Sequence, residues 1–531
     1  MAGIDSSDHV EAVIRKPSTI EELQALVHEA EQCCTLHRTF GPPSSVKDEL
    51  ILSLKNITPQ VMEIDESACT VTCSAGITFA MLAAHLEENG WALHTLPSDV
   101  DVAIGDALTV GTHGSGDRCE CLLAALVGCE YVDGDGNLIS SGPSRSLPST
   151  TDTTLQAILL GGLGIVVEVT LRIERSYLVR QDVYVNMPWG RVEETGYLDE
   201  LFAHAYSVSM FTDFVFTTQE DEPPVMQQVW FKHRLPMVKP DGTEHEAAKE
   251  PPSVLFGATL APKQIHPIPA RKQPGSQCTK QGNPPGPWSE RLPHYHPEWS
   301  SSEPDGLHSE YYIAREHGVD AIQALRNIAH IDLVPRMNIL EIRSVAADEV
   351  WCSPAYRRPS LAFDLKWGPQ IEERMVRRLL IKVESALAPF LARPGWGTVF
   401  NYLPDVIRPL YPMMPRFREL VKQHRTGANR KFRNPVLDRY ILEEAKASAQ
   451  ASAPASAPFA DPHAELVARL SQTTKLGPRP YDMLLGSHGN GHVGRWQDEV
   501  TEEADELRKT RELLTRPLHA YGGQVRYTLN E

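Results

Sequence analysis

Apolar residues near the N-terminus recur with the spacing of an amphipathic helix. The residues that share its apolar face are Ile20, Leu23, Leu26 and Val27. Ser18 and Glu21 just before and within this run have the spacing of a capping box. We therefore predict a helix that begins at Ser18 and ends near the adjacent cysteines Cys33 and Cys34.

Further along the chain, apolar and polar residues alternate in the manner of β-strands. Residues 71–76 and 82–90 predict a strand, a glycine turn and a helix. Residues 132–137 predict a hairpin turn, and residues 160–170 predict a glycine turn that enters a β-branched strand. Between 179 and 232 the clearer predicted strands cover residues 183–187, 214–218 and 229–232.

Three other segments lack this periodicity. Residues 235–287 are rich in Pro, Lys, Gln and Gly, which predicts a long surface loop. Residues 447–458 are a run of Ala, Ser and Pro typical of a linker, and a polar helix is predicted at 498–514. Glycines surround His488 and His492, so we expect a flexible loop there and no metal site.

Composition sets the class of protein. The 531 residues are 41% hydrophobic and 23% charged, as in soluble proteins of two or three domains. A net charge of −18 disfavours binding to nucleic acid or anionic membranes. Nine cysteines without regular spacing, no leader pattern and no long apolar run predict a cytoplasmic protein without a membrane span. The oligomeric state stays open.

A glycine-rich stretch ends at Gly116. Gly111, Gly114 and Gly116 let the backbone turn its N–H groups toward an anion, and Thr112 and Ser115 add hydroxyl donors. This pattern suits a pyrophosphate, although its spacing matches neither the dinucleotide fingerprint nor the P-loop. A tight turn between strands is the alternative.

Two predicted strands carry charged residues on one face. Glu341 and Arg343 lie two positions apart, so both point to one side, where they could hold and polarise polyol hydroxyls. A surface ion pair is the alternative. In the next strand, Asp364 and Lys366 share a face with Ala362, opposite an apolar face formed by Phe363, Leu365 and Trp367.

Several of these motifs resemble one flavoprotein family in chain order. They are Gly111–Gly116, Gly286–His294, His308–Tyr311, Glu341–Asp348 and Ser353–Tyr356. They are similar to the alditol oxidases and the D-arabinono-1,4-lactone and L-gulonolactone oxidases, a branch of the vanillyl-alcohol-oxidase flavoproteins. The resemblance implies an α+β fold in which a two-subdomain FAD-binding domain of the PCMH type carries an antiparallel-sheet substrate cap domain.

The resemblance also implies domain boundaries. The FAD-binding domain would span residues 1–178 and the cap domain residues 179–424. The chain would return to the FAD-binding domain at 425–443, where Lys431–Asn434 resembles the closing motif of the family. A linker at 444–460 and a C-terminal extension at 461–531 would follow.

The activity implied is FAD-dependent oxidation of a CH–OH group in an alditol or aldono-1,4-lactone, with O2 as acceptor and H2O2 as product. The catalytic residues would be Glu341, Arg343 and Lys366. Arg343 would hold developing alkoxide charge, Lys366 would assist electrostatically or as a base, and Glu341 would orient both. The substrate-binding residues would be His308, Asp364 and Thr398. The cofactor-binding residues would be Ser44, Gly111, Thr112, His113, Gly114, Ser115, Gly116, Gly164 and Lys431.

Some positions depart from the family pattern. Ser44 stands where relatives carry the histidine that bonds covalently to the flavin, so we predict a dissociable FAD; His37 is the alternative attachment point. Asp106 would place a carboxylate near the phosphates. Lys366 and Thr398 stand where relatives carry Thr and Lys, and His308 stands where they carry Gln.

These departures leave two other functions open. One is an FAD-linked tailoring oxidoreductase that acts on a different substrate. The other is a non-catalytic relative that has lost its flavin.

Overall fold

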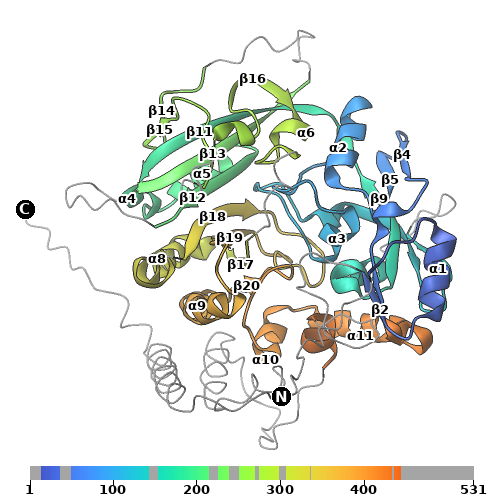
Figure 1. Cartoon of the computed structure of the whole chain (residues 1–531). Coiled ribbons are helices and arrows are strands. Elements are labelled where there is room, and N and C mark those ends of the chain that lie inside the picture. Colours follow the sequence, from blue (N-terminus) through green and yellow to red (C-terminus); the bar gives the residue numbers. More distant parts are fainter. Residues whose placement is uncertain are drawn as a thin grey trace, which may run out of the picture.

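The computed structural model describes residues 14–35, 50–142, 153–214, 225–237, 250–268, 274–297, 306–334, 336–432 and 436–443, and the statements below concern those residues. Figure 1 shows the N-terminal elements in blue beside a large sheet in green and yellow, with helices α8 and α9 below that sheet.

The first helix, α1, spans Ile20–Glu29 and buries Leu23 and Val27, as its apolar face predicts. Its N-cap is Thr19, one residue later than predicted, because the Thr19 hydroxyl accepts from the Glu22 amide. The Glu22 carboxylate in turn accepts from the Ser18 amide at 2.7 Å, so the two residues cap the helix reciprocally.

Two small sheets and a five-stranded sheet make up the N-terminal part. The three-stranded parallel sheet contains β1 (Ile14–Arg15), β3 (Leu50–Leu52) and β2 (Cys33–Thr35). The antiparallel five-stranded sheet has the order β4 (Met62–Asp65), β5 (Thr70–Ser74), β9 (Ile165–Arg172), β7 (Leu126–Val132) and β8 (Leu138–Ser141). β6 (Trp91–Ala92) pairs with β10 (Glu174–Arg175). The N-terminal part also contains helices α2 (Phe79–Glu88) and α3 (Ile104–Thr109). The hairpin turn predicted at 132–137 is confirmed, because it joins the antiparallel strands β7 and β8.

A ten-stranded antiparallel sheet follows. Its order is β14 (Val254–Leu255), β15 (Ala258–Leu260), β11 (Tyr177–Pro188), β13 (Val225–Pro236), β12 (Ser207–Thr212), β18 (Met337–Val345), β19 (Ser360–Trp367), β17 (His308–Ala314) and β20 (Arg393–Pro394), with β16 (Gly282–Pro287) on β11. The expected α+β fold with an antiparallel sheet is confirmed. β12 was not predicted, and residues 215–218 of the strand predicted at 214–218 lie outside the described residues.

The long surface loop predicted at 235–287 contains short strands in its described parts, while residues 261–268 lie outside any helix or strand. Residues 254–260 form a hairpin on β11, and β16 pairs with the same strand. Glutamine side chains supply backbone hydrogen bonds here, because Gln264 donates to the Gly275 and Cys278 carbonyls and Gln281 to the Ile265 carbonyl. Because hydrogen bonds from side chains order this segment, its sequence shows no hydrophobic periodicity from which the structure could be predicted.

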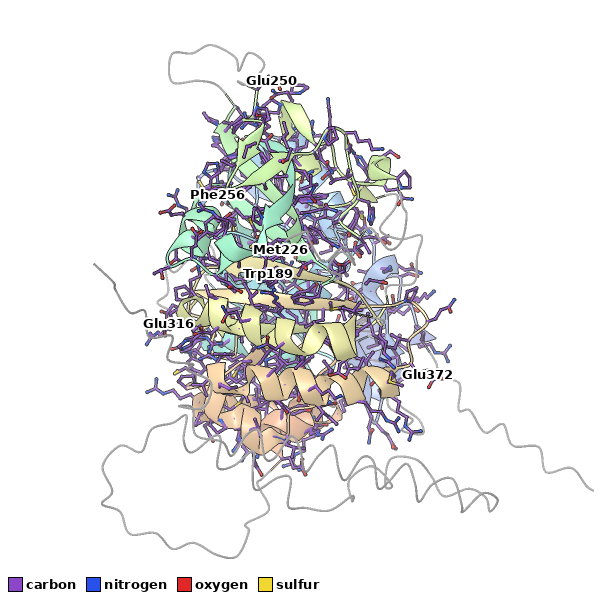
Figure 2. All side chains as sticks on the ribbon, turned by 90° about the vertical axis from the view of Figure 1, so that its left-hand side faces the viewer. Trp189, Met226, Glu250, Phe256, Glu316 and Glu372 are labelled. Atoms are coloured by element: carbon purple, nitrogen blue, oxygen red, sulfur yellow. The ribbon has the colours of Figure 1, made fainter. Side chains whose placement is uncertain are left out.

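Strands β18 and β19 have one apolar face and one face that carries their charged residues. Helices α8 (Gly318–Ile328) and α9 (Glu373–Leu387) lie side by side below the sheet (Figure 2). Leu340, Ile342, Phe363 and Leu365 lie in the same core as the apolar residues of these helices. Since side chains alternate along a strand, Glu341, Arg343 and Asp364 point to the other face.

Shorter helices connect these layers. They are α4 (Trp189–Val192), α5 (Tyr197–Ala203), α6 (Trp288–Arg291), α10 (Pro404–Ile407) and α11 (Met414–His424). Figure 2 places Trp189 and Met226, both fully buried, within the upper half of the molecule. The linker, the helix at 498–514 and the histidines His488 and His492 lie outside the described residues. None of the described helices combines the length and apolar character needed to cross a bilayer.

Glu384 on α9 gives a prediction for stability. Burial raises the pKa of Glu384 to about 7, although hydrogen bonds from the Asn401 amide and the Tyr311 hydroxyl partly oppose this. The folded state thus holds a proton that the unfolded chain releases near pH 4.5. Stability should therefore fall by up to about 3 kcal/mol as pH rises from about 4.5 to beyond 7.

Denaturant unfolding of Glu384→Gln against the parent across this pH range is the measurement. The free-energy difference between the two should shift in favour of the variant as pH rises. Glu373→Gln, at an exposed position of the same helix, is the control. Parallel pH curves for the parent and Glu384→Gln would contradict the prediction.

Candidate active site

Three adjacent strands bring the predicted catalytic and substrate-binding residues together. In the register of β18, β19 and β17, Glu341 lies opposite Asp364, which lies opposite Glu310. His308 lies opposite Lys366, one step along the same face. The charged face of the sheet therefore carries a cluster of acidic and basic side chains from residues separated in sequence.

Glu341 is the most enclosed member of this cluster, with no exposed surface. Its Oε2 accepts from the Lys366 ammonium at 2.9 Å, and its Oε1 lies 2.8 Å from His294 Nε2 and 3.8 Å from Arg343 Nε. Burial alone would raise the pKa of Glu341, but Lys366, Arg343 and His294 hold it well below its usual value. Glu341 is therefore a carboxylate near neutral pH.

The surroundings of Lys366 disfavour the role of base that the sequence allowed. Burial would lower the pKa of Lys366, but the Glu341 carboxylate, with Tyr295 and Asp364, raises it above its usual value. The Lys366 ammonium lies 3.8 Å from Asp364, and 22% of the Lys366 side chain is exposed. Lys366 is therefore a cation near neutral pH.

Arg343 is held by a carboxylate that the sequence analysis missed. Its Nη2 lies 2.6 Å from Glu310 Oε1, and its Nη1 lies 3.4 Å from the Ser98 hydroxyl. Glu310 also accepts from the Tyr312 hydroxyl at 3.1 Å and contacts His113 Nε2 at 3.0 Å. Although burial acts in the opposite sense, His113 and Arg343 lower the pKa of Glu310. The sequence signal for Glu310 was its position two residues after His308, which puts both side chains on the same face of one strand.

Asp364 and His308 form the outer side of the cluster. His308 Nδ1 lies 3.2 Å from Asp364 Oδ1, and 43% of the His308 side chain is exposed. Burial lowers the pKa of His308, but the hydrogen bond and charge of Asp364 outweigh this and raise it. The structure thus brings two of the three predicted substrate-binding residues together, with His308 at the accessible edge and Asp364 buried beside it.

Thr398 has a different role from the one predicted. Its hydroxyl donates to the Gly395 carbonyl at 2.9 Å and accepts from the Glu310 amide at 3.1 Å. Its polar group is therefore engaged with backbone and supports the strand that carries Glu310.

The glycine-rich stretch packs against the charged cluster, and its amides bond to the protein. The Gly111, Thr112 and Gly116 amides donate to the Leu108, Ala107 and Ser344 carbonyls, so these three N–H groups cannot cradle a pyrophosphate as predicted. The Ser115 hydroxyl likewise donates to the Val208 carbonyl at 2.6 Å. The stretch instead places His113 against Glu310.

Gly114 and Ser115 line a small gap beside the cluster. The other side chains at this gap include Ser98, Ser207 and His294. A Cβ at Gly114 would lie 1.9 Å from the Thr95 hydroxyl oxygen, so only glycine permits this close approach. The gap links the glycine-rich stretch to the residues around Glu341.

The main cavity lies elsewhere in the N-terminal part and has a volume of about 170 Å³. Its lining residues are Leu52, Ser53, Leu54, Lys55, Ala75, Gly76, Asp101, Val102, Ala103, Gly105, Asp106, Thr109, Ile158, Gly161, Leu163, Gly164 and Val166. Gly164 is thus the one predicted cofactor residue on its described wall. Asp106 lies on that wall too.

The walls of this cavity fit a diphosphate-bearing group such as part of FAD. Side chains are excluded at two of its glycines, because a Cβ at Gly76 or Gly164 would lie 2.5 or 2.6 Å from a backbone carbonyl oxygen. Backbone therefore forms much of the surface, and Lys55 adds a positive charge. The carboxylates of Asp101 and Asp106 oppose this positive charge, which weakens the attraction of the cavity walls for an anion.

Lys431, another predicted cofactor residue, is not among the residues that line this cavity. The Lys431 ammonium donates to the Val27 and His28 carbonyls at the C-terminal end of α1, where the helix dipole favours a cation. These hydrogen bonds keep the ammonium away from the cavity wall. Ser44 and the alternative His37 lie outside the described residues. The described part of the chain also contains no cluster of three His, Cys, Asp or Glu residues arranged to hold a metal ion.

Sequence reasoning also missed a buried pair behind Glu341. His294, 3% exposed by side chain, contacts Glu341, and Lys232 contacts His294. The three residues come from separate segments, and only the sheet topology brings them together. His294 ends the Gly286–His294 motif, which was the one sequence signal for it.

Comparison with known proteins agrees with this arrangement. The family described as "FAD binding domain" matches residues 11–142, and the family "D-arabinono-1,4-lactone oxidase" matches residues 306–440. The chain is 30% identical to an alditol oxidase of a Streptomyces species over 80% of this chain and 94% of that protein. It is 22% identical to an L-gulono-1,4-lactone dehydrogenase of Mycobacterium tuberculosis over 81% of this chain and 96% of that one.

Solved structures show the same fold. Cholesterol oxidase from B. sterolicum matches with a TM-score of 0.58 and 13% identity over 81% of this chain and 94% of that chain. The family resemblance stated from the motifs is therefore confirmed, together with the FAD-binding PCMH-type fold. The chain belongs to the alditol oxidase family of FAD-dependent oxidoreductases.

Proposed function

We propose that this protein oxidises a CH–OH group of an alditol or an aldono-1,4-lactone, with FAD as hydride acceptor and O2 as the final acceptor, giving H2O2. The observation that carries the proposal is the cluster of Glu341, Arg343 and Lys366 on a buried sheet face. This face meets the glycine-rich stretch directly, because Glu310 contacts His113 and the Ser344 carbonyl accepts from the Gly116 amide.

FAD would be held by the cavity between Gly76, Gly105 and Gly164, and it supplies the acceptor for the hydride that leaves the substrate carbon. Gly114 and Ser115, beside the gap at His294, would flank the place where this cofactor and the substrate meet. The protein residues then need to bind the polyol, orient its hydroxyl group and stabilise the charge that develops on its oxygen.

Arg343 is suited to stabilise that oxygen. Glu310 and Ser98 fix its guanidinium, and its Nε is buried without a hydrogen-bond partner among the described residues. A buried N–H group without a hydrogen-bond partner destabilises the folded protein, and binding of an acceptor removes this penalty. A substrate oxygen is such an acceptor.

Lys366 would contribute a second positive charge, and Glu341 would hold both cations in place. The Lys366 ammonium is fixed by Glu341 at 2.9 Å yet remains partly exposed, so it can donate to a substrate hydroxyl. A preorganised cation stabilises alkoxide charge without reorganisation during the reaction. His308, at the accessible edge, and Asp364, buried beside it, would bind the hydroxyl groups further along the polyol.

The compartment is also part of this proposal. Eight cysteines within the described part of the chain form no disulfide, and seven of them are buried: Cys33, Cys73, Cys119, Cys121, Cys129, Cys278 and Cys352. This supports a reducing location such as the cytoplasm.

Peroxide production by the purified, flavin-loaded protein tests the function. A panel of alditols and aldono-1,4-lactones should contain at least one substrate that gives H2O2 with steady-state turnover. An inactive holoenzyme across the panel would contradict the proposal. A colourless protein that takes up no added FAD would instead support a relative that has lost its flavin.

The role of Lys366 yields a mutational prediction. Lys366→Thr should lower turnover by about 100-fold with flavin content unchanged, because one cation that faces the developing alkoxide is lost. Lys382→Thr, which removes a lysine paired with Asp332 on the helical side, is the matched control and should leave turnover unchanged. Adding Thr398→Lys to Lys366→Thr should restore part of the activity, if the two positions have exchanged their residues. An active Lys366→Thr enzyme would show that Arg343 suffices.

The attachment of the flavin is a separate prediction. Because Ser44 is a poor nucleophile where relatives carry a histidine, FAD should leave the protein on acid precipitation. Absorbance spectra of the supernatant and the pellet measure this. A yellow supernatant is expected, whereas flavin that stays with the denatured chain would refute the prediction and point to His37.

A further inference from the structure

A lysine ammonium lies buried behind Glu341, on the strand two removed from it. Lys232 on β13 is 1% exposed. Its Nζ contacts three acceptors: the carbonyl oxygen of Leu292, the carbonyl oxygen of Pro293 at 3.1 Å and His294 Nδ1 at 3.1 Å. Three acceptors match the three protons of an ammonium, so each proton has one partner.

This arrangement fixes the protonation of His294. An ammonium can only donate, so His294 Nδ1 accepts and carries no proton. The proton of the neutral imidazole is therefore on Nε2, which lies 2.8 Å from Glu341 Oε1 and donates to it. The Ser209 hydroxyl, 3.4 Å from Nε2, is the other polar group nearby.

We propose that Lys232 and His294 are positioning residues for Glu341: the protonated lysine fixes the imidazole tautomer, the imidazole holds the carboxylate, and loss of the lysine proton releases it. The catalytic importance of Glu341 rests on the proposed function. The contacts of Lys232 with His294 and of His294 with Glu341 are independent of it.

The release follows from counting protons. A neutral amine has two hydrogens for the two carbonyls and His294, so one of these acceptors loses its donor. If the amine keeps both carbonyls, its lone pair faces His294 Nδ1, which then favours the tautomer with the proton on Nδ1. The bare Nε2 would face the Glu341 carboxylate, where two acceptors repel. Glu341 Oε1 then loses its hydrogen bond.

The surroundings place this change near neutral pH. Burial lowers the pKa of Lys232 to about 7, although the Glu341 carboxylate and Cys278 act in the opposite direction. Burial and the Lys232 charge lower the pKa of His294 to about 4, so the imidazole is neutral above that pH. The titratable or charged groups that face the pair from the packed elements are Glu341, Arg343, Lys366, Cys278 and Tyr295.

Aromatic rings enclose the imidazole. The ring centroids of Trp230 and Phe211 lie 5.3 and 5.7 Å from that of His294. These rings leave His294 few polar partners besides Lys232, Ser209 and Glu341. A change at Lys232 is therefore passed to Glu341 and is not absorbed by solvent.

Nitrogen NMR of the ring-labelled histidines tests the pair without any substrate. In the FAD-loaded parent at pH 6, the signals of His294, assigned by their loss in His294→Gln, should show a protonated Nε2 and a bare Nδ1. They should move toward the other tautomer as pH rises through about 7 to 9. His233→Gln, a histidine on the opposite face of the same strand, is the control for assignment. A proton on Nδ1 at pH 6, or no change with pH, overturns the proposal.

Kinetics test the consequence for catalysis. Lys232→Met should behave at every pH as the parent does when Lys232 has lost its proton. Its kcat should be about 10-fold below that of the parent, with little change in KM. The fall in kcat that we expect in the parent at alkaline pH should be absent from this variant. Lys382→Met should retain the parent profile. His294→Gln, which keeps an N–H donor toward Glu341, should retain more activity than His294→Leu. An unchanged alkaline fall in folded Lys232→Met overturns the proposal.

The two experiments separate this inference from the proposed function. If the holoenzyme oxidises no polyol or lactone, the proposed function fails, and the NMR titration of the parent still decides whether Lys232 controls His294. Should Lys232→Met fail to fold, the parent titration and the His294→Gln and His294→Leu pair decide the question.

Discussion

The contact of Arg343 with three carboxylates is the interaction on which this site depends. Its guanidinium lies 2.6 Å from Glu310, 3.8 Å from Glu341 and 3.9 Å from Asp364. Each of the three carboxylates is less than 9% exposed, and burying such a group is costly unless a cation lies nearby. Lys366 contacts Glu341 and Asp364 as well, but Arg343 is the cation that lies within 4 Å of all three. Arg343 therefore stabilises the sheet register that sets these acids side by side on β17, β18 and β19.

The same contacts connect the cap sheet to the FAD-binding part. Glu310 holds Arg343 on one side and His113 of the glycine-rich stretch on the other. A buried, hydrogen-bonded carboxylate of this kind ties the position of one element to the other. The charged cluster and the glycine-rich stretch are therefore held together as one unit.

Alternation along single strands was sufficient to predict Glu341, Arg343, Asp364 and Lys366 as one face. The register between strands cannot be obtained from alternation, so the contact of Glu310 with Arg343 could not be predicted. The role of the glycine-rich stretch was misjudged for a related reason. Its glycines do allow close approach, but backbone carbonyls of α3 and β18 take up amides that were expected to bind a pyrophosphate.

Long-range topology explains the other differences. Lys232, His294 and Glu341 meet only because β12 lies between β13 and β18 in the sheet. Thr398 was expected in the pocket, but its hydroxyl caps local backbone around Gly395. The protonation of Lys366 likewise depends on its neighbours, because Glu341 reverses the effect that burial alone would have.

Reduction of the bound flavin in the absence of oxygen tests the central claim most directly, because it isolates the step in which the charged cluster acts. Holoenzyme mixed anaerobically with an alditol or aldono-1,4-lactone should lose its oxidised flavin absorbance, and Arg343→Met with the same flavin content should lose it at least about 100-fold more slowly. Flavin that stays oxidised in the parent with every polyol and lactone, or equal rates in the two proteins, would contradict the account.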